Sequence, residues 1–221
     1  MVKNKLLSMV LAGAILAGGA ALAFDGATAG AEVPPKEIES IPTPVEKNVS
    51  LETKFTDIDH HWAYNDIVSL EAIGMWEDLT DEFGPKKTVT GAELISALDK
   101  IFGFRGEPDL GLHLELEISR IEVAKAIEKS FQIKKLSVIT TLIFPIYEDT
   151  KELTPEESSA LSFVFNTGIM RGRTEDKFYP YDPITRAEMA VVLNRTLATM
   201  EYAEPMEENA DGETGQDEWH D

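Results

Sequence analysis

Apolar residues recur at helical spacing in three stretches of this chain, and each stretch opens with the same polar pattern. The openings are Thr90-Gly-Ala-Glu93, Ser119-Arg-Ile-Glu122 and Thr185-Arg-Ala-Glu188. A Ser or Thr with Glu three residues later has the spacing of a capping box, in which each side chain accepts a hydrogen bond from the other residue's backbone N–H. The three copies predict three capped amphipathic helices and indicate an internal repeat. A repeat favours a binding module or scaffold over an enzyme.

Two further helices are predicted upstream of the first and last capped helices. One follows His61 and Trp62 and ends near Gly74, and the other begins after Thr154 with Pro155 at its first position. The predicted helices therefore span 62–73, 91–102, 120–132, 155–167 and 186–200. We expect a mostly α fold of helix–loop–helix units in which the three capped helices share one core, because no single unit can bury its apolar stripe alone.

The N-terminal residues 1–31 have the pattern of a secretion signal. Lys3 and Lys5 precede an apolar run, and small residues at the right spacing allow cleavage after residue 23, 29 or 31. A permanent membrane anchor is the alternative, but the Gly and Ala content favours a removed signal peptide and no membrane contact afterwards. The absence of cysteine excludes a lipobox anchor and a disulfide framework.

The rest of the chain divides by composition into a linker, a folded region and a tail. Residues 32–54 form a Pro-rich linker, residues 55–200 hold units at about 55–102, 110–133 and 147–200, and residues 201–221 are acidic. The tail has nine acidic residues and no Lys or Arg, so we expect disorder, with calcium binding as the less favoured alternative. With 40 acidic and 20 basic residues overall, the chain is not expected to bind nucleic acid.

The loops before the capped helices also repeat, most completely in the last unit. That unit reads Gly168-Ile-Met-Arg-Gly172, then Phe178-Tyr-Pro180, then Ile184-Thr-Arg-Ala-Glu188. The first unit keeps Phe55, Asp57 and His61-Trp-Ala63, but Asp78 stands at the second glycine and Gly91 at the arginine. The middle unit keeps little beyond its capped opening.

In these motifs the chain resembles the S-layer homology (SLH) domain. The resemblance implies three units packed around a pseudo-threefold helical core. It also implies a secreted protein held without a covalent bond to the cell wall or S-layer, through an anionic, often pyruvylated, secondary cell-wall polysaccharide. The alternative is an interaction module for another envelope protein, in which degenerate units no longer bind glycan.

The chemistry of such a ligand indicates candidate binding residues. A ketal-linked pyruvate is a small carboxylate, which a guanidinium fork binds well. Arg120 and Arg186 stand second in their capped openings, where the helix N-terminus also favours an anion. The alternative for Arg186 is a pair with an acidic neighbour, and Thr185 and Glu188 are expected to cap rather than bind.

Further candidates lie in the last and first units. Gly172 would let the backbone approach a sugar ring, and Arg171 and Arg173 add positive charge beside it. Trp62 is expected either to pack in the core or to stack on a sugar. No catalytic constellation, cofactor motif or metal-ligand spacing is present in the sequence, so we do not expect an enzyme.

Overall fold

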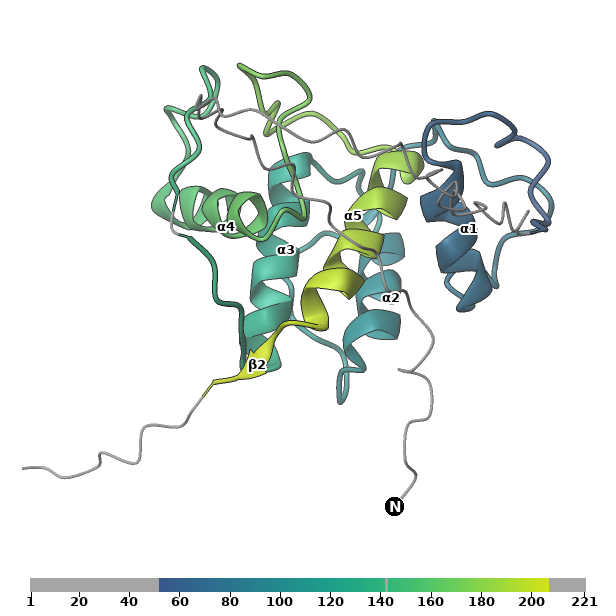
Figure 1. Ribbon diagram of the computed structural model, residues 1–221, viewed down its shortest axis with the longest axis horizontal. Coiled ribbons are helices and arrows are strands. Elements are labelled where there is room, and N and C mark those ends of the chain that lie inside the picture. Colours follow the sequence, from purple (N-terminus) through teal and green to yellow (C-terminus); the bar gives the residue numbers. More distant parts are fainter. Residues whose placement is uncertain (1–51, 142, 207–221) are drawn as a thin grey trace, which may run out of the picture. The chain divides into compact units, whose positions relative to one another are not determined.

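The computed structural model describes residues 52–141 and 143–206. The predicted signal peptide, linker residues 32–51 and tail residues 207–221 lie outside the described residues. In chain order the elements are α1 (Tyr64–Ala72), α2 (Gly91–Phe102), α3 (Arg120–Ile133), β1 (Leu136–Ser137), α4 (Pro155–Asn166), α5 (Arg186–Met200) and β2 (Glu204–Pro205); Figure 1 labels the helices and β2. The mostly α class predicted from the sequence is confirmed.

The local helix signals predict the helix bounds closely. Thr90, Ser119, Thr154 and Thr185 each cap a helix, and all four capping boxes have both reciprocal hydrogen bonds. Helix α1 begins two residues later than predicted, at Tyr64, because no side chain caps its N-terminus. The capped openings therefore behave as local units that fix where each helix begins.

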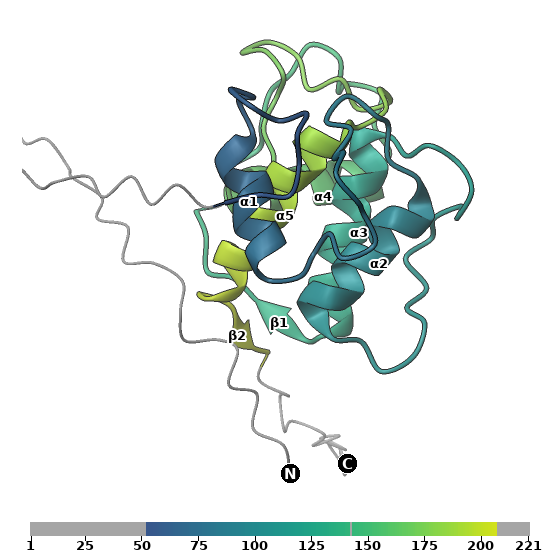
Figure 2. The same cartoon turned by 90° about the vertical axis from the view of Figure 1, so that its right-hand side faces the viewer.

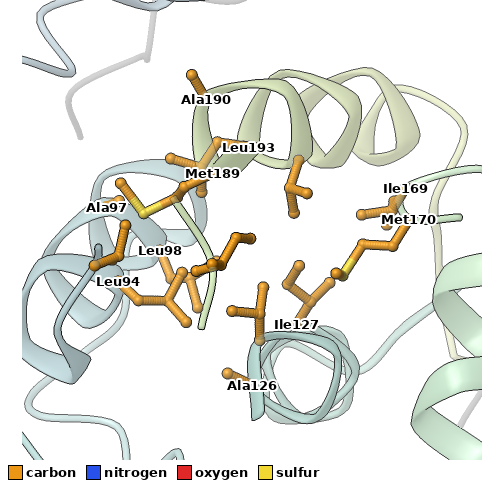
Figure 3. Packing of buried hydrophobic residues seen from close by; sticks show 14 of the residues in the cluster. Leu94, Ala97, Leu98, Ala126, Ile127, Ile169, Met170, Met189, Ala190 and Leu193 are labelled. Carbon is orange, nitrogen blue, oxygen red and sulfur yellow. The ribbon is translucent and has the colours of Figure 1, made fainter. Parts of the chain in front are cut away.

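The three capped helices contribute to one hydrophobic core. Helix α2 contacts both α3 and α5, while α3 packs mainly on α4 and α1 mainly on α5. Leu98 of α2, Ile127 of α3 and Leu193 of α5 are fully buried in the same cluster (Figure 3). The expectation that the capped helices share a core is confirmed.

The residues just before the three capped helices form a closed ring of backbone hydrogen bonds. Val89 N donates to Ile184 O (3.1 Å), Ile184 N to Ile118 O (3.1 Å), and Ile118 N to Val89 O (3.0 Å). These residues stand at the same position relative to their caps, so the ring joins the three helix openings directly. Pseudo-threefold packing of the helices themselves stays a prediction.

The chain after α5 is ordered further than the composition indicated. Glu204 and Pro205 form β2, which pairs antiparallel with β1, and Met206 N donates to Lys135 O (2.8 Å), as Figure 2 shows for the two strands. The prediction of a disordered tail from residue 201 onward is therefore wrong for residues 204 and 205. Strand pairing needs backbone groups rather than apolar side chains, so an acidic composition does not prevent it.

The end of the predicted linker also contacts the fold. Thr53 Oγ1 and Lys54 N donate to the carboxylate of Glu71, and Lys54 Nζ donates to Trp76 O (2.9 Å).

Across the described ranges, no helix has the length and apolar composition needed to cross a bilayer.

Candidate functional site

Each capped helix begins against a loop from a different unit. Helix α5 lies on loop 83–87, α3 on loop 178–182 and α2 on loop 112–116; we call these contacts the α5, α3 and α2 junctions. In each junction the first two N–H groups of the helix donate to carbonyls of the loop, which satisfies groups that have no partner inside a helix. At the α5 junction, Arg186 N donates to Lys87 O and Ala187 N to Pro85 O. At the α3 junction, Arg120 N donates to Asp182 O and Ile121 N to Pro180 O. At the α2 junction, Gly91 N donates to Leu116 O and Ala92 N to Leu114 O.

Arg186 holds the α5 junction from inside the protein. Its side chain is only 7% exposed; Nη2 donates to Glu93 Oε1 (2.7 Å) and Nη1 donates to Phe83 O. Its guanidinium also lies over the Phe83 ring, 5.8 Å from the ring centre. The alternative interpretation, in which Arg186 pairs with an acidic neighbour, is confirmed. Both terminal nitrogens are bonded within the protein.

The Glu93 carboxylate serves two helices at once. It accepts from Thr90 N in its own capping box and from Arg186 of another unit. Burial raises the pKa of Glu93, but the Thr90 N–H and the Arg186 guanidinium together outweigh burial and hold the pKa below its usual value. This carboxylate therefore stays ionised and links the opening of α2 to that of α5.

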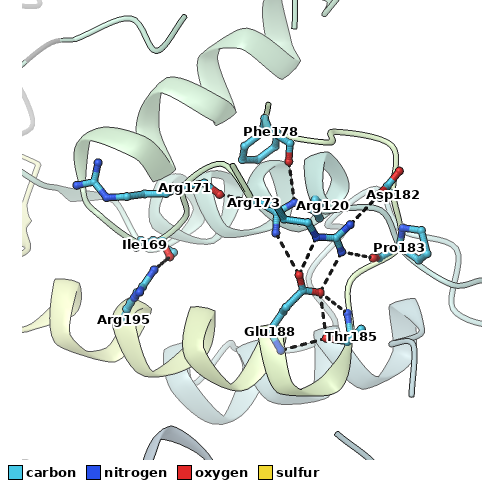
Figure 4. Close-up of polar contacts among 10 residues, drawn as sticks. All are labelled: Arg120, Ile169, Arg171, Arg173, Phe178, Asp182, Pro183, Thr185, Glu188 and Arg195. Carbon is cyan, nitrogen blue, oxygen red and sulfur yellow. Dashed lines mark hydrogen bonds and ion pairs between the residues drawn. The ribbon is translucent and has the colours of Figure 1, made fainter. Parts of the chain in front are cut away.

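Arg120 occupies the equivalent place in the α3 junction, shown in Figure 4. Its Nε donates to Phe178 O (3.0 Å), Nη2 donates to Arg171 O (2.7 Å), and the guanidinium lies 4.7 Å from the Phe178 ring centre. Burial lowers the pKa of Arg120, partly offset by Glu188 at 3.8 Å. Like Arg186, Arg120 stacks on an aromatic ring and bonds to the carbonyl of the same residue.

Arg173 completes this cluster from the neighbouring loop (Figure 4). Its Nε and Nη2 bind the two oxygens of Glu188 at 2.8 and 3.1 Å, and Nη1 binds Asp182 at 2.8 Å. The hydrogen bond to Glu188 raises the pKa of Arg173. Burial raises the pKa of Glu188, but the hydrogen bonds from Arg173 and Thr185 outweigh burial, so the pKa of Glu188 is lowered overall. The charge of Arg173 is therefore largely neutralised by two carboxylates.

The α2 junction lacks both the arginine and the phenylalanine. Gly91 takes the arginine position, and Leu112 stands where the other two loops have Phe83 and Phe178. A Cβ at Gly91 would lie 2.3 Å from His113 O, so even alanine does not fit without movement. The sequence indicates that Gly91 only removes ligand chemistry; the structure shows instead that loop 112–116 approaches too closely for any side chain.

Gly172 is likewise required by contacts inside the protein. Its N–H donates to Tyr147 Oη (2.9 Å), and an added Cβ would lie 2.5 Å from Thr174 O and 2.6 Å from Lys177 O. The close backbone approach expected here is therefore made by the protein's own loop and by the Tyr147 ring.

Arg173 reaches the surface but is paired with Glu188 and Asp182. Two other exposed candidates, Arg171 and Trp62, have no such pairing within the described residues. Arg171 is exposed, and its guanidinium lies 5.0 Å from the ring centre of Phe165. Among the residues that the structure describes, no carboxylate pairs with Arg171. Trp62 is 66% exposed, so the alternative that it packs in the core is wrong. The buried indole is Trp76, which the sequence analysis did not single out and whose Nε1 donates to Ile67 O (3.1 Å).

A groove of about 550 Å³ lies beside the α3 opening. Its lining includes Glu117, Glu122 and Glu157, with Tyr181 and with Lys125 as the basic residue. Lys125 pairs with Glu156 at 3.1 Å, so the groove is acidic and suits an anion poorly. Over residues 52–141 and 143–206, no cluster of three or more His, Asp or Glu side chains has the arrangement of a metal site.

The fold and these junctions define a helical repeat module in which each capped helix packs on a loop of another unit. Residues 146–190 match the family model of the S-layer homology domain. The family recognised from the motifs is confirmed over these residues. A domain of this family implies association with the cell wall or envelope. The comparison with curated proteins found no match for this chain.

Proposed function

We propose that this protein is secreted and attaches to the cell wall by binding an anionic, pyruvylated secondary cell-wall polysaccharide, as a binding module rather than an enzyme. The observation that carries this proposal is the SLH match at residues 146–190, which contains Arg171 as an exposed guanidinium without a carboxylate partner among the described residues. The other candidate arginines are committed to the junctions.

Arg171 has the properties that recognition of a pyruvate ketal requires. A planar guanidinium can bind a carboxylate through two parallel hydrogen bonds, which a lysine cannot reproduce. The contact with the Phe165 ring restrains the guanidinium, and Arg171 nevertheless stays exposed to solvent. The bond from Arg120 to the Arg171 carbonyl fixes the backbone from which this side chain projects. In this proposal the buried Arg120 positions the exposed Arg171.

Trp62 provides a second type of contact in the first unit. Trp62 is 66% exposed, and an exposed indole can stack its apolar face on a sugar ring. Trp62 and Arg171 would then bind different sugars of one polymer, or different polymers.

The alternative function is an interaction module for another envelope protein. The acidic lining of the groove beside α3 favours this alternative, because its glutamates would repel an anionic polymer. Binding to the polymer must therefore occur at the surface around Arg171 rather than in this groove.

The experiment is a sedimentation assay with purified cell-wall sacculi, with and without chemical removal of the secondary polymer. Arg171→Ala should weaken binding about ten- to hundredfold, the value of one charge-assisted contact. Arg171→Lys should restore only part of it. Arg105→Ala is the matched control, because Arg105 is also exposed and its loss changes the net charge equally.

Two results would favour the protein-binding alternative. One is full binding by folded Arg171→Ala protein, and the other is binding that does not change when the polymer is removed.

A further inference from the structure

Residues 138–141 and 143–146, which we call the apolar segment, expose large hydrophobic side chains to solvent. Ile139 is 87% exposed, Ile143 51%, Phe144 70% and Ile146 92%. From Ser137 to Ile146 the sequence contains no charged residue. Exposed apolar patches of several hundred Å² on a soluble protein usually mark an interaction surface.

Val138 packs against the core, whereas the exposed residues that follow it are held beside α4. The side chain of Asn166 binds both the N–H and the C=O of Ile143 at 2.9 Å. Phe144 and Thr140 line a groove of about 420 Å³ together with residues of α4. Figure 1 shows the chain running past α4 at this point.

Over its described residues, the backbone of this segment has few hydrogen-bond partners. Within residues 139–141 and 143–146, the structure describes backbone hydrogen bonds at Ile143 alone, and both are made with the side chain of Asn166. The segment also continues directly from β1 and contains no described turn or bend. A segment with β-branched residues and open backbone hydrogen-bonding groups can add another strand.

We propose that the apolar segment is the surface through which two copies of this chain associate, with the two segments side by side and antiparallel. The net charge of −20 makes most surfaces of one copy repel another, whereas this uncharged stretch does not. An antiparallel arrangement also brings Lys135 at the start of one segment toward Glu148 after the end of the other. In the same register Ile139 of each copy lies opposite Phe144 of its partner.

The exposed area is sufficient for a weak dimer. Each of the four side chains offers on the order of 100–200 Å² of apolar surface, so complete burial of all four in both copies would remove at most roughly 1,200 Å². That is the lower limit for a specific interface, which corresponds to a reversible, concentration-dependent association. A lipid surface fits less well, because anionic headgroups would repel a protein of this charge.

Sedimentation velocity of the purified chain between about 1 µM and 1 mM tests the proposal, because weak dimers dissociate within this range. Wild-type protein should shift from monomer to dimer as its concentration rises. Ile139→Lys and Phe144→Lys should both leave it monomeric, since each puts charge where the copies meet. Ile73→Lys is the control, because Ile73 is exposed outside the segment (55%).

A charge exchange separates this geometry from non-specific association. Glu148→Lys alone should weaken the dimer, and Lys135→Glu combined with Glu148→Lys should restore it. A wild-type monomer at all concentrations would overturn the proposal, and so would a dimer that Ile139→Lys and Phe144→Lys leave intact. Binding of monomers to anionic phospholipid vesicles, lost in Phe144→Lys, would assign the segment to lipid instead.

Discussion

Arg186→Ala should destabilise the folded protein strongly, because this arginine joins two units at the α5 junction. The substitution removes a hydrogen bond to Phe83 O, an ion pair with Glu93 and the contact with the Phe83 ring. It also leaves the buried Phe83 carbonyl without this donor. The cost is therefore that of breaking a largely buried pair, and not that of losing a surface salt bridge.

The expected loss is about 2–4 kcal/mol in the free energy of unfolding. Hydrogen bonds to charged groups contribute about 1.5–3 kcal/mol each, and removing one partner of a buried pair costs about 3–5 kcal/mol. The Glu93 side chain is 31% exposed, so water partly solvates its carboxylate once Arg186 is gone. The loss should therefore lie toward the lower end of the range for buried pairs. For a domain of this size the melting temperature should fall by roughly 10 °C.

Urea unfolding of Arg186→Ala, Glu93→Gln and the double variant provides the measurement. The double-mutant cycle should give a coupling of about 1–2 kcal/mol between the two side chains. Arg105→Ala, at an exposed arginine, should change stability by less than about 0.5 kcal/mol. Arg186→Lys should be intermediate, because an ammonium cannot reach both acceptors in the geometry of a guanidinium.

The coupling should also depend on pH with a defined sign. The folded-state pKa of Glu93 is lowered, so its contribution is present above the unfolded-state pKa of about 4.3 and is lost as the pH falls through the folded value. A coupling below about 0.3 kcal/mol at neutral pH would refute the reasoning. So would a destabilisation by Arg186→Ala no larger than that of Arg105→Ala.

Two further predictions concern stability. Gly91→Ala should destabilise the folded protein by about 1–3 kcal/mol and so lower its melting temperature, because the alanine Cβ would overlap His113 O. An unchanged melting temperature would show that loop 112–116 can move away. Glu128→Gln should stabilise the protein at about pH 7 and lose this advantage below about pH 4. Burial raises the pKa of Glu128; the hydrogen bond from Ser159 offsets this only in part, and the negative charge of Glu156 adds to it. The folded state therefore favours the protonated carboxyl group. The stabilisation from that preference is lost as the pH rises through the folded-state pKa. Thermal unfolding across this pH range measures the difference, and equal stabilisation at both ends would contradict it.

The sequence by itself determined where most helices begin and end. The bounds predicted for two capped helices, 91–102 and 186–200, agree with the structure at both ends. Capping boxes involve residues three positions apart, so the information needed to recognise them is present in a short stretch of sequence. The repeat and the SLH resemblance follow from the same local signals.

Which arginine faces a ligand could not be read from those signals. Arg120 and Arg186 occupy the same helix position, and the residues that bury them lie far away in the chain. Phe178 is 58 residues from Arg120, and Phe83 is 103 residues from Arg186. Only the packing of one unit's helix on another unit's loop commits both guanidinium groups to the junctions. The same packing leaves Arg171 exposed.

The tertiary structure also reversed what hydrophobicity alone indicates at two places. Trp62 is largely exposed although its motif resembles a core position, and the apolar segment faces solvent although its composition is that of a buried strand. Side-chain chemistry sets the preference for burial, but burial itself requires a neighbouring surface to pack against. In this chain the core is filled by other residues, including Trp76 and the stripes of the capped helices, so the sequence determined the helices and the tertiary contacts decided which residues remain available for binding.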